Sequence, residues 1–224
     1  MGVPVVVELF VDALCPFSLI AARRVREAVG EFEGAARLQL RALPLVPDPA
    51  RLERAAGSRE GARLVLARRL EEAAALTGGE NLEVGVEAFR DGRLRVVSSL
   101  VPLAAVKWAQ IAVGDVAAWR LFVEVASRYL EHGEDVGDPA VLADAAREHG
   151  LPWIDLLQVL EKGIHGRDVA RDRQHARTLG LKATPAAVLD GRVRLEGLAA
   201  LDEYREAIAQ RLLWQSRRRE VATH

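Results

Sequence analysis

Apolar residues follow different spacings near the start of the chain, and the changes predict a strand, a helix and a second strand. From Val3 to Val11 nearly every residue is apolar and many are β-branched, which is typical of a strand buried on both faces of a sheet. From Phe17 the apolar residues recur every three or four positions, as on one face of a helix that ends near Gly30. Residues 37–43 then alternate between apolar and polar, which indicates another strand. This order is a βαβ unit.

The middle of the chain has mostly helical spacing. Prolines within residues 44–49 interrupt the pattern, and from about residue 52 to 179 apolar residues recur at positions that share a helix face. Asp138 followed by Pro139 has the form of a helix N-cap and first turn. We therefore expect an all-helical insertion domain over residues 47–164.

Strand patterns return near the C-terminus. Residues 186–189 and 192–196 flank the turn dipeptide Asp190-Gly191, which predicts a β-hairpin, and a final helix follows. The complete order is βαβ, a helical block and then αββα, which fits an α/β, thioredoxin-like sheet interrupted by an all-helical insertion. The predicted division is a thioredoxin-like domain over residues 1–46 and 165–214, the insertion over 47–164 and a flexible tail over 215–224.

Composition and charge exclude several classes of protein. Half of the 224 residues are hydrophobic and 28% are charged, which suits a packed core. The 31 basic and 32 acidic residues give a formal net charge of −1, which argues against a nucleic-acid binder. The start of the chain lacks the pattern of a signal peptide, and no apolar run approaches the ~20 residues that a membrane helix needs. We expect a cytoplasmic protein with neither nucleic acid nor membrane as a partner.

The chain contains one cysteine, Cys15. One thiol excludes an intrachain disulfide and a multi-thiolate metal site, and no metal is expected. Pro16 follows directly, which predicts that Cys15 caps the first helix, where backbone N–H groups and the helix dipole stabilise a thiolate. The Ser18 hydroxyl, three residues along, can donate a hydrogen bond to the sulfur. The alternative is a small core residue, because free cysteine is among the most buried residue types.

Two further positions bear on Cys15. Asp12 either tunes the cysteine, by raising its pKa or by transferring a proton, or serves as a turn residue that satisfies backbone donors. Thr184-Pro185 directly precedes the hairpin. Pro185 either simply starts a strand or forms a cis-proline loop, which would hold the Thr184 backbone beside the thiol to pair with an extended ligand.

These segments resemble a known family. Residues 5–25, VVVELFVDALCPFSLIAARRV, are similar to the active-site strand and helix of the DsbA-like thioredoxin superfamily, and most of all to its FrnE-like and 2-hydroxychromene-2-carboxylate isomerase-like branch. The segment ARTLGLKATPAAVLDGRVRLEG resembles the family's terminal helix, cis-proline loop and β-hairpin, with Pro185 in the cis-proline position. The chain has Ser18 where the family's oxidoreductases carry a second cysteine. It has Cys15 where kappa-class glutathione transferases and the chromene isomerases usually carry serine.

The resemblance implies a DsbA-family thiol oxidoreductase that uses a single cysteine through a mixed disulfide. The implied catalytic residues are Cys15, Ser18, Pro16 and Asp12, and the implied substrate-binding residues are Phe17, Thr184 and Pro185. Two alternatives stay open: a glutathione-dependent isomerase or transferase, and a non-catalytic peptide-binding module. The expected partner is a thiol or disulfide, small molecule or protein. No tightly bound cofactor is expected, with glutathione or another low-molecular-weight thiol as co-substrate. Monomer and dimer both remain open.

Overall fold

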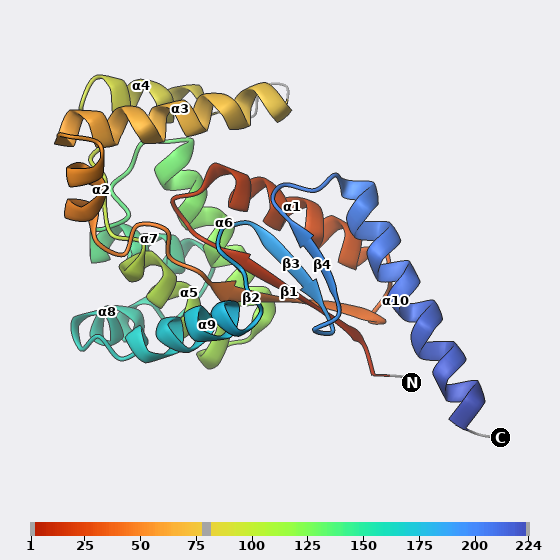
Figure 1. Cartoon of the computed structure of the whole chain (residues 1–224). Helices are drawn as coiled ribbons and strands as arrows, with labels where there is room; N and C mark the ends of the chain where they lie inside the picture. Colours follow the sequence, from red (N-terminus) through yellow and green to blue (C-terminus); the bar gives the residue numbers. More distant parts are fainter. Residues whose placement is uncertain (1–2, 78–81, 223–224) are drawn as a thin grey trace.

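The computed structural model describes residues 3–77 and 82–222 and contains a four-stranded sheet (Figure 1). The strands are β1 (Val5–Val11), β2 (Ala36–Ala42), β3 (Ala186–Leu189) and β4 (Val193–Glu196), in the order β2-β1-β3-β4. β1 and β2 are parallel and are joined by helix α1 (Pro16–Gly30), so the predicted βαβ unit is confirmed. β3 pairs antiparallel with both β1 and β4, which confirms the predicted hairpin.

The chain between β2 and β3 is helical in its described residues. Helix α6 packs against α1 and β2, α5 packs against α9, and α2 and α4 both pack against α3. The helices are α2 (Pro49–Ala55), α3 (Arg59–Thr77), α4 (Glu83–Arg90), α5 (Leu100–Ala112), α6 (Asp115–Leu130), α7 (Pro139–Glu148), α8 (Trp153–Glu161) and α9 (Gly166–Thr178). α7 begins at the predicted place, because the Asp138 side chain accepts a hydrogen bond from the backbone of Ala140.

The two faces of the sheet bury different sets of residues, because successive side chains of a strand point to opposite sides. Val7 and Leu9 of β1 belong to the main core, together with residues of α1 and of the last helix, α10 (Leu201–Ala222). Phe10 faces a smaller cluster that includes Ala176 of α9. The sheet is therefore covered by α1 and α10 on one face and by α9 on the other (Figure 1).

Helix α10 continues through Ala222, where the sequence predicted a flexible tail from residue 215. Contacts with the hairpin hold this extension. The Gln215 amide donates to the Asp190 carboxylate at 3.1 Å, and the guanidinium of Arg192 in the hairpin lies 5.2 Å from the centre of the Trp214 ring. Residues 223–224 of the predicted tail lie outside the described residues.

No helix within residues 3–77 and 82–222 is both long enough and apolar enough to cross a membrane.

Candidate active site

Cys15 lies where β1 ends and α1 begins. Its backbone is extended, with φ −101° and ψ 114°, and Pro16 occupies the first turn of the helix, so Cys15 is the N-cap that the sequence predicted. The Cys15 carbonyl accepts hydrogen bonds from the backbone N–H groups of Ser18 at 3.0 Å and Leu19 at 3.3 Å. Pro16 fits here because the first N–H groups of a helix have no partner within the helix.

The thiol of Cys15 is buried, with 3% of the residue exposed. Burial raises the pKa of this thiol above its ordinary value, and the charge of Asp12 raises it further. Interactions with the side chains of Ser18 and Thr184 lower the pKa, but they do not outweigh the loss of hydration. The structure thus corrects the prediction of a thiolate stabilised by the helix N-terminus. The cap position is as predicted, but desolvation favours the neutral thiol.

The loop before β3 touches the sulfur. The Thr184–Pro185 peptide bond is cis, and the Cys15 Sγ lies 3.8 Å from the Thr184 carbonyl oxygen, to which the thiol donates. The Thr184 hydroxyl is buried and has no hydrogen-bond partner among the described residues. It therefore remains available as a donor to a thiolate, and its interaction with Cys15 is one of those that lower the thiol pKa.

Ser18 and Asp12 contact each other near Cys15, and both are buried. The Ser18 Oγ accepts a hydrogen bond from the backbone N–H of Asp12 at 3.3 Å, which leaves the hydroxyl proton for the sulfur. The Asp12 carboxylate accepts from the backbone N–H groups of Leu14 at 2.7 Å and Leu45 at 2.5 Å. Asp12 is therefore a turn residue and also a charge near Cys15, so the two interpretations of the sequence apply together.

Burial also changes Asp12 itself. Loss of hydration raises the pKa of its carboxyl group above the ordinary value, although hydrogen bonds from Leu45, Leu14, Ser99 and Val46 act in the opposite direction. The Ser99 hydroxyl further accepts from the backbone N–H of Val46 at 3.0 Å. No local motif in the sequence links Ser99 to Asp12, so the sequence alone did not place these two residues side by side.

A cavity of about 240 Å³ opens beside Cys15. It lies between the β1–α1 connection, the loop after β2, and helices α2 and α3. Its lining residues are Asp12, Leu14, Cys15, Leu45, Val46, Leu52, Val65, Leu66 and Arg69. The lining residues from Leu45 onward were not predicted from the sequence, because no motif links them to Cys15. Phe17 does not belong to this lining and packs, half-buried, against the main core, so its substrate-binding role stays a prediction.

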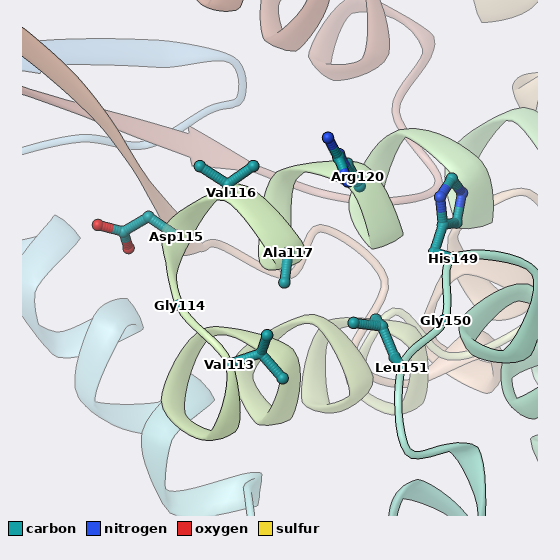
Figure 2. Close-up of a pocket in the computed structure, with 9 residues that line it drawn as sticks. All are labelled: Val113, Gly114, Asp115, Val116, Ala117, Arg120, His149, Gly150 and Leu151. Carbon is teal, nitrogen blue, oxygen red and sulfur yellow. The ribbon is translucent and has the colours of Figure 1, made fainter. Parts of the chain in front are cut away.

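A second pocket, of about 410 Å³, lies between the α5–α6 turn and the α7–α8 connection. Figure 2 shows Val113, Ala117 and Leu151 at its centre, with Arg120 and His149 toward one end and Asp115 at the other. It shares no lining residue with the Cys15 cavity, and none of the predicted site residues borders it. The smaller cavity is therefore the candidate active site.

Comparisons with known proteins give the same fold. The family model described as "DSBA-like thioredoxin domain" matches residues 6–209. The cytosolic disulfide reductase DsbM from Pseudomonas aeruginosa is 22% identical over 93% of this chain and 99% of that chain, with a TM-score of 0.72. Its structure with GSH covers 92% and 98%, at 21% identity and a TM-score of 0.68. Oxidised BdbD from Bacillus subtilis covers 93% and 88%, at 14% identity and a TM-score of 0.60.

These likenesses confirm the predicted thioredoxin-like α/β fold with its helical insertion. No curated protein sequence matches the chain.

Proposed function

The chain belongs to the family of DSBA-like thioredoxin domains, and from this premise we propose that it is a thiol oxidoreductase whose nucleophile is Cys15. The proposal rests on three features that are all found at the Cys15 sulfur. Cys15 caps a helix, contacts the loop that holds the cis peptide bond of Pro185, and borders an open cavity. The placement in the FrnE-like branch stays a prediction.

The reaction is thiol–disulfide exchange in two steps. The Cys15 thiol loses its proton and attacks a disulfide, R–S–S–R. A Cys15–S–S–R bond forms as the R–S–S–R bond breaks, and the RS⁻ that leaves takes up a proton. An external thiol then attacks the mixed disulfide, forms a new disulfide with R–S and restores the Cys15 thiol. The second thiol must come from outside because the chain has no other cysteine.

The neighbours of Cys15 have separate roles in this scheme. Ser18 and Thr184 donate hydrogen bonds to the thiolate and offset part of the cost of its burial. Pro16 occupies the first turn of α1, where its missing N–H costs no hydrogen bond within the helix. Burial raises the pKa of the Asp12 carboxyl group, which makes Asp12 a better acceptor for the thiol proton than an exposed carboxylate.

Glutathione or another low-molecular-weight thiol is the proposed co-substrate. The support is that DsbM, a protein of the same fold described as a cytosolic disulfide reductase, has been solved with GSH. A cytoplasmic location fits this chemistry, because small thiols keep that compartment reducing. Small-molecule and protein disulfides are both substrates under this scheme.

The test is intact-mass analysis after incubation of the folded protein with oxidised glutathione at neutral pH. The expected result is one glutathione adduct, which peptide mapping places on Cys15 and which reduced glutathione removes. Cys15→Ser is the matched control and should gain no adduct. A wild-type protein that stays unmodified over hours, while its Cys15 is intact and the protein is folded, would refute the monothiol mechanism.

The apolar lining of the cavity favours a second candidate, a glutathione-dependent isomerase or transferase of the 2-hydroxychromene-2-carboxylate isomerase or kappa-class type. Leu45, Leu52 and Val65 offer a place for an aromatic substrate next to the sulfur. This candidate expects turnover of an aromatic electrophile with glutathione and no stable mixed disulfide. The adduct experiment therefore separates the two functions.

A further inference from the structure

The cavity beside Cys15 has one wall from the sheet end and another from the helical insertion. Leu14, Leu45 and Val46 form the first wall, while Leu52 of α2 and residues of α3 form the second. Besides Cys15, the ionisable side chains of the lining are those of Asp12 and Arg69. When a disulfide reacts with Cys15, the substituent on its sulfur (here called its arm) must therefore lie along apolar side chains.

The cavity is large enough for a ring. An engineered, apolar cavity of roughly 150 Å³ holds a benzene molecule, and the cavity here measures about 240 Å³. An aromatic or branched aliphatic arm fits that space with room for one small polar group. The arm is also favoured energetically, because it covers apolar surface that water otherwise contacts.

The two charged groups of the lining differ in what they can bind. Both oxygens of Asp12 already accept backbone hydrogen bonds, from Leu14 and Leu45, and the residue is fully buried. Arg69 is exposed, and no acidic side chain in the described ranges forms an ion pair with it. By contrast Arg23 and Arg41 bind carboxylates at 2.9 Å and 2.6 Å. Of these two groups, the guanidinium of Arg69 is therefore the one that can donate hydrogen bonds to a bound anion.

We propose that Arg69 selects, among the disulfides that react with Cys15, those whose arm beyond the sulfur is apolar and ends in a carboxylate. The apolar arm occupies the cavity beside Cys15, and the carboxylate binds the planar guanidinium, whose paired N–H groups match its two oxygens. The inference rests on the proposed function, since it names the substrate class of the same site. Arg69 acts in specificity and takes no part in the exchange of sulfur bonds.

Two reagents that differ by one group test the inference. 2,2′-Dithiodipyridine is a neutral aromatic disulfide, and 6,6′-dithiodinicotinic acid is the same disulfide with a carboxylate on each ring. Both release a coloured thione when a thiol attacks, so the second-order rate constant for Cys15 is measured with each. The quantity compared is the ratio of the rate constant for the acid to that for the neutral reagent.

Arg69→Gln should lower this ratio about fivefold, as expected for the loss of one solvent-accessible charge pair. Arg68→Gln is the matched control. Arg68 is the preceding residue of α3, is also exposed and does not line the cavity. The Arg68→Gln substitution removes the same charge as Arg69→Gln, so the ratio of the two rate constants should stay at the wild-type value. Arg69→Lys should fall between wild type and Arg69→Gln, because it keeps the charge without the planar fork.

A ratio that is unchanged in Arg69→Gln, or that falls equally in Arg68→Gln, overturns the role of Arg69. The proposed function survives that result, because both reagents still modify Cys15. If neither reagent modifies Cys15 in the wild-type protein, the proposed function is wrong. The proposed selectivity of Arg69 is then wrong as well, because it depends on that function.

Discussion

The thiol of Cys15 donates a hydrogen bond to the main-chain carbonyl of Thr184, with 3.8 Å between sulfur and oxygen. The same residue carries a buried hydroxyl that has no partner within the described part of the chain. Thr184 therefore offers an acceptor to the thiol through its backbone and a donor to the thiolate through its side chain. One residue can satisfy Cys15 in both of its protonation states.

Replacing Thr184 by valine should make Cys15 a weaker acid. The substitution removes the hydroxyl that lowers the thiol pKa and keeps the shape of the side chain. A hydrogen bond to a charged group is worth about 1.5–3 kcal/mol, so alkylation of Cys15 by iodoacetamide should slow about tenfold at neutral pH. The measurement is the pH dependence of labelling by intact mass. Thr184→Ser keeps the hydroxyl and should stay close to wild type; equal profiles for valine and serine would contradict this role.

Asp12→Asn should change how stability depends on pH. Burial raises the pKa of Asp12, so the folded protein holds this proton at pH values where the unfolded chain has released it. Asp12 therefore favours folding most at pH values below its unfolded pKa of 3.8, and this contribution is lost as pH rises through the folded pKa.

Urea unfolding of wild type and Asp12→Asn between pH 4 and pH 8 tests this sign. The advantage of wild type over the variant should shrink as pH rises across that window. The variant also loses one acceptor for the Leu14 and Leu45 N–H groups, which costs about 1–3 kcal/mol. Asp155→Asn, at an exposed carboxylate of α8, serves as control. A difference that grows with pH would show that the pKa of Asp12 is lowered.

Ser18→Cys should create a dithiol that forms a disulfide with Cys15. Position 18 lies one turn into α1, and its side chain already interacts with the Cys15 sulfur. Mild oxidation should remove both free thiols, and insulin reduction should become faster because the new thiol resolves the mixed disulfide internally. The Asp12 N–H loses its hydroxyl acceptor, so the reduced variant should be about 1 kcal/mol less stable. Two thiols that both persist after oxidation would contradict the site.

Lys107→Met should destabilise the junction between the insertion and the sheet. The Lys107 ammonium lies 2.8 Å from the Asp172 carboxylate, and both side chains are buried. Removing one partner of a buried ion pair costs about 3–5 kcal/mol, and the lower end applies here because Arg41 still binds Asp172 at 3.2 Å. Lys162→Met, at an exposed lysine, should change the unfolding free energy by less than about 0.5 kcal/mol. Equal urea midpoints for the two variants would contradict this assignment.

Local patterns in the sequence were enough for much of the fold. The apolar run of β1, the Cys15–Pro16 cap and the Asp138–Pro139 cap depend on a few adjacent residues, and the structure has each at the predicted place. The Asp190-Gly191 hairpin is equally local, and Asp190 adopts a positive φ of 50° that suits a tight turn. These features could be predicted because their physics lies within one or two turns of chain.

The environment of Cys15 could not be predicted in the same way. Residues distant in the sequence surround it: Thr184 contacts the sulfur, and Val46, Leu52 and Leu66 line the cavity beside it. The sign of the pKa shift followed from the burial of Cys15, so reasoning from the helix N-terminus alone was wrong. Arg69 reaches the cavity only through the packing of α3, which its local sequence does not reveal. The extension of α10 beyond residue 214 likewise needed the contact of Gln215 with Asp190.

The contact between Cys15 and Thr184 has a consequence for the synthesis of the protein. The two residues are 169 positions apart, and ribosomes add roughly 5–20 residues per second. Cys15 therefore leaves the ribosome on the order of ten to thirty seconds before the loop that closes over it. During that interval β1 also lacks its neighbour β3, and the thiol faces the small oxidants and electrophiles of the cell without its enclosure. The nascent chain is the stage at which this cysteine is most open to adventitious modification.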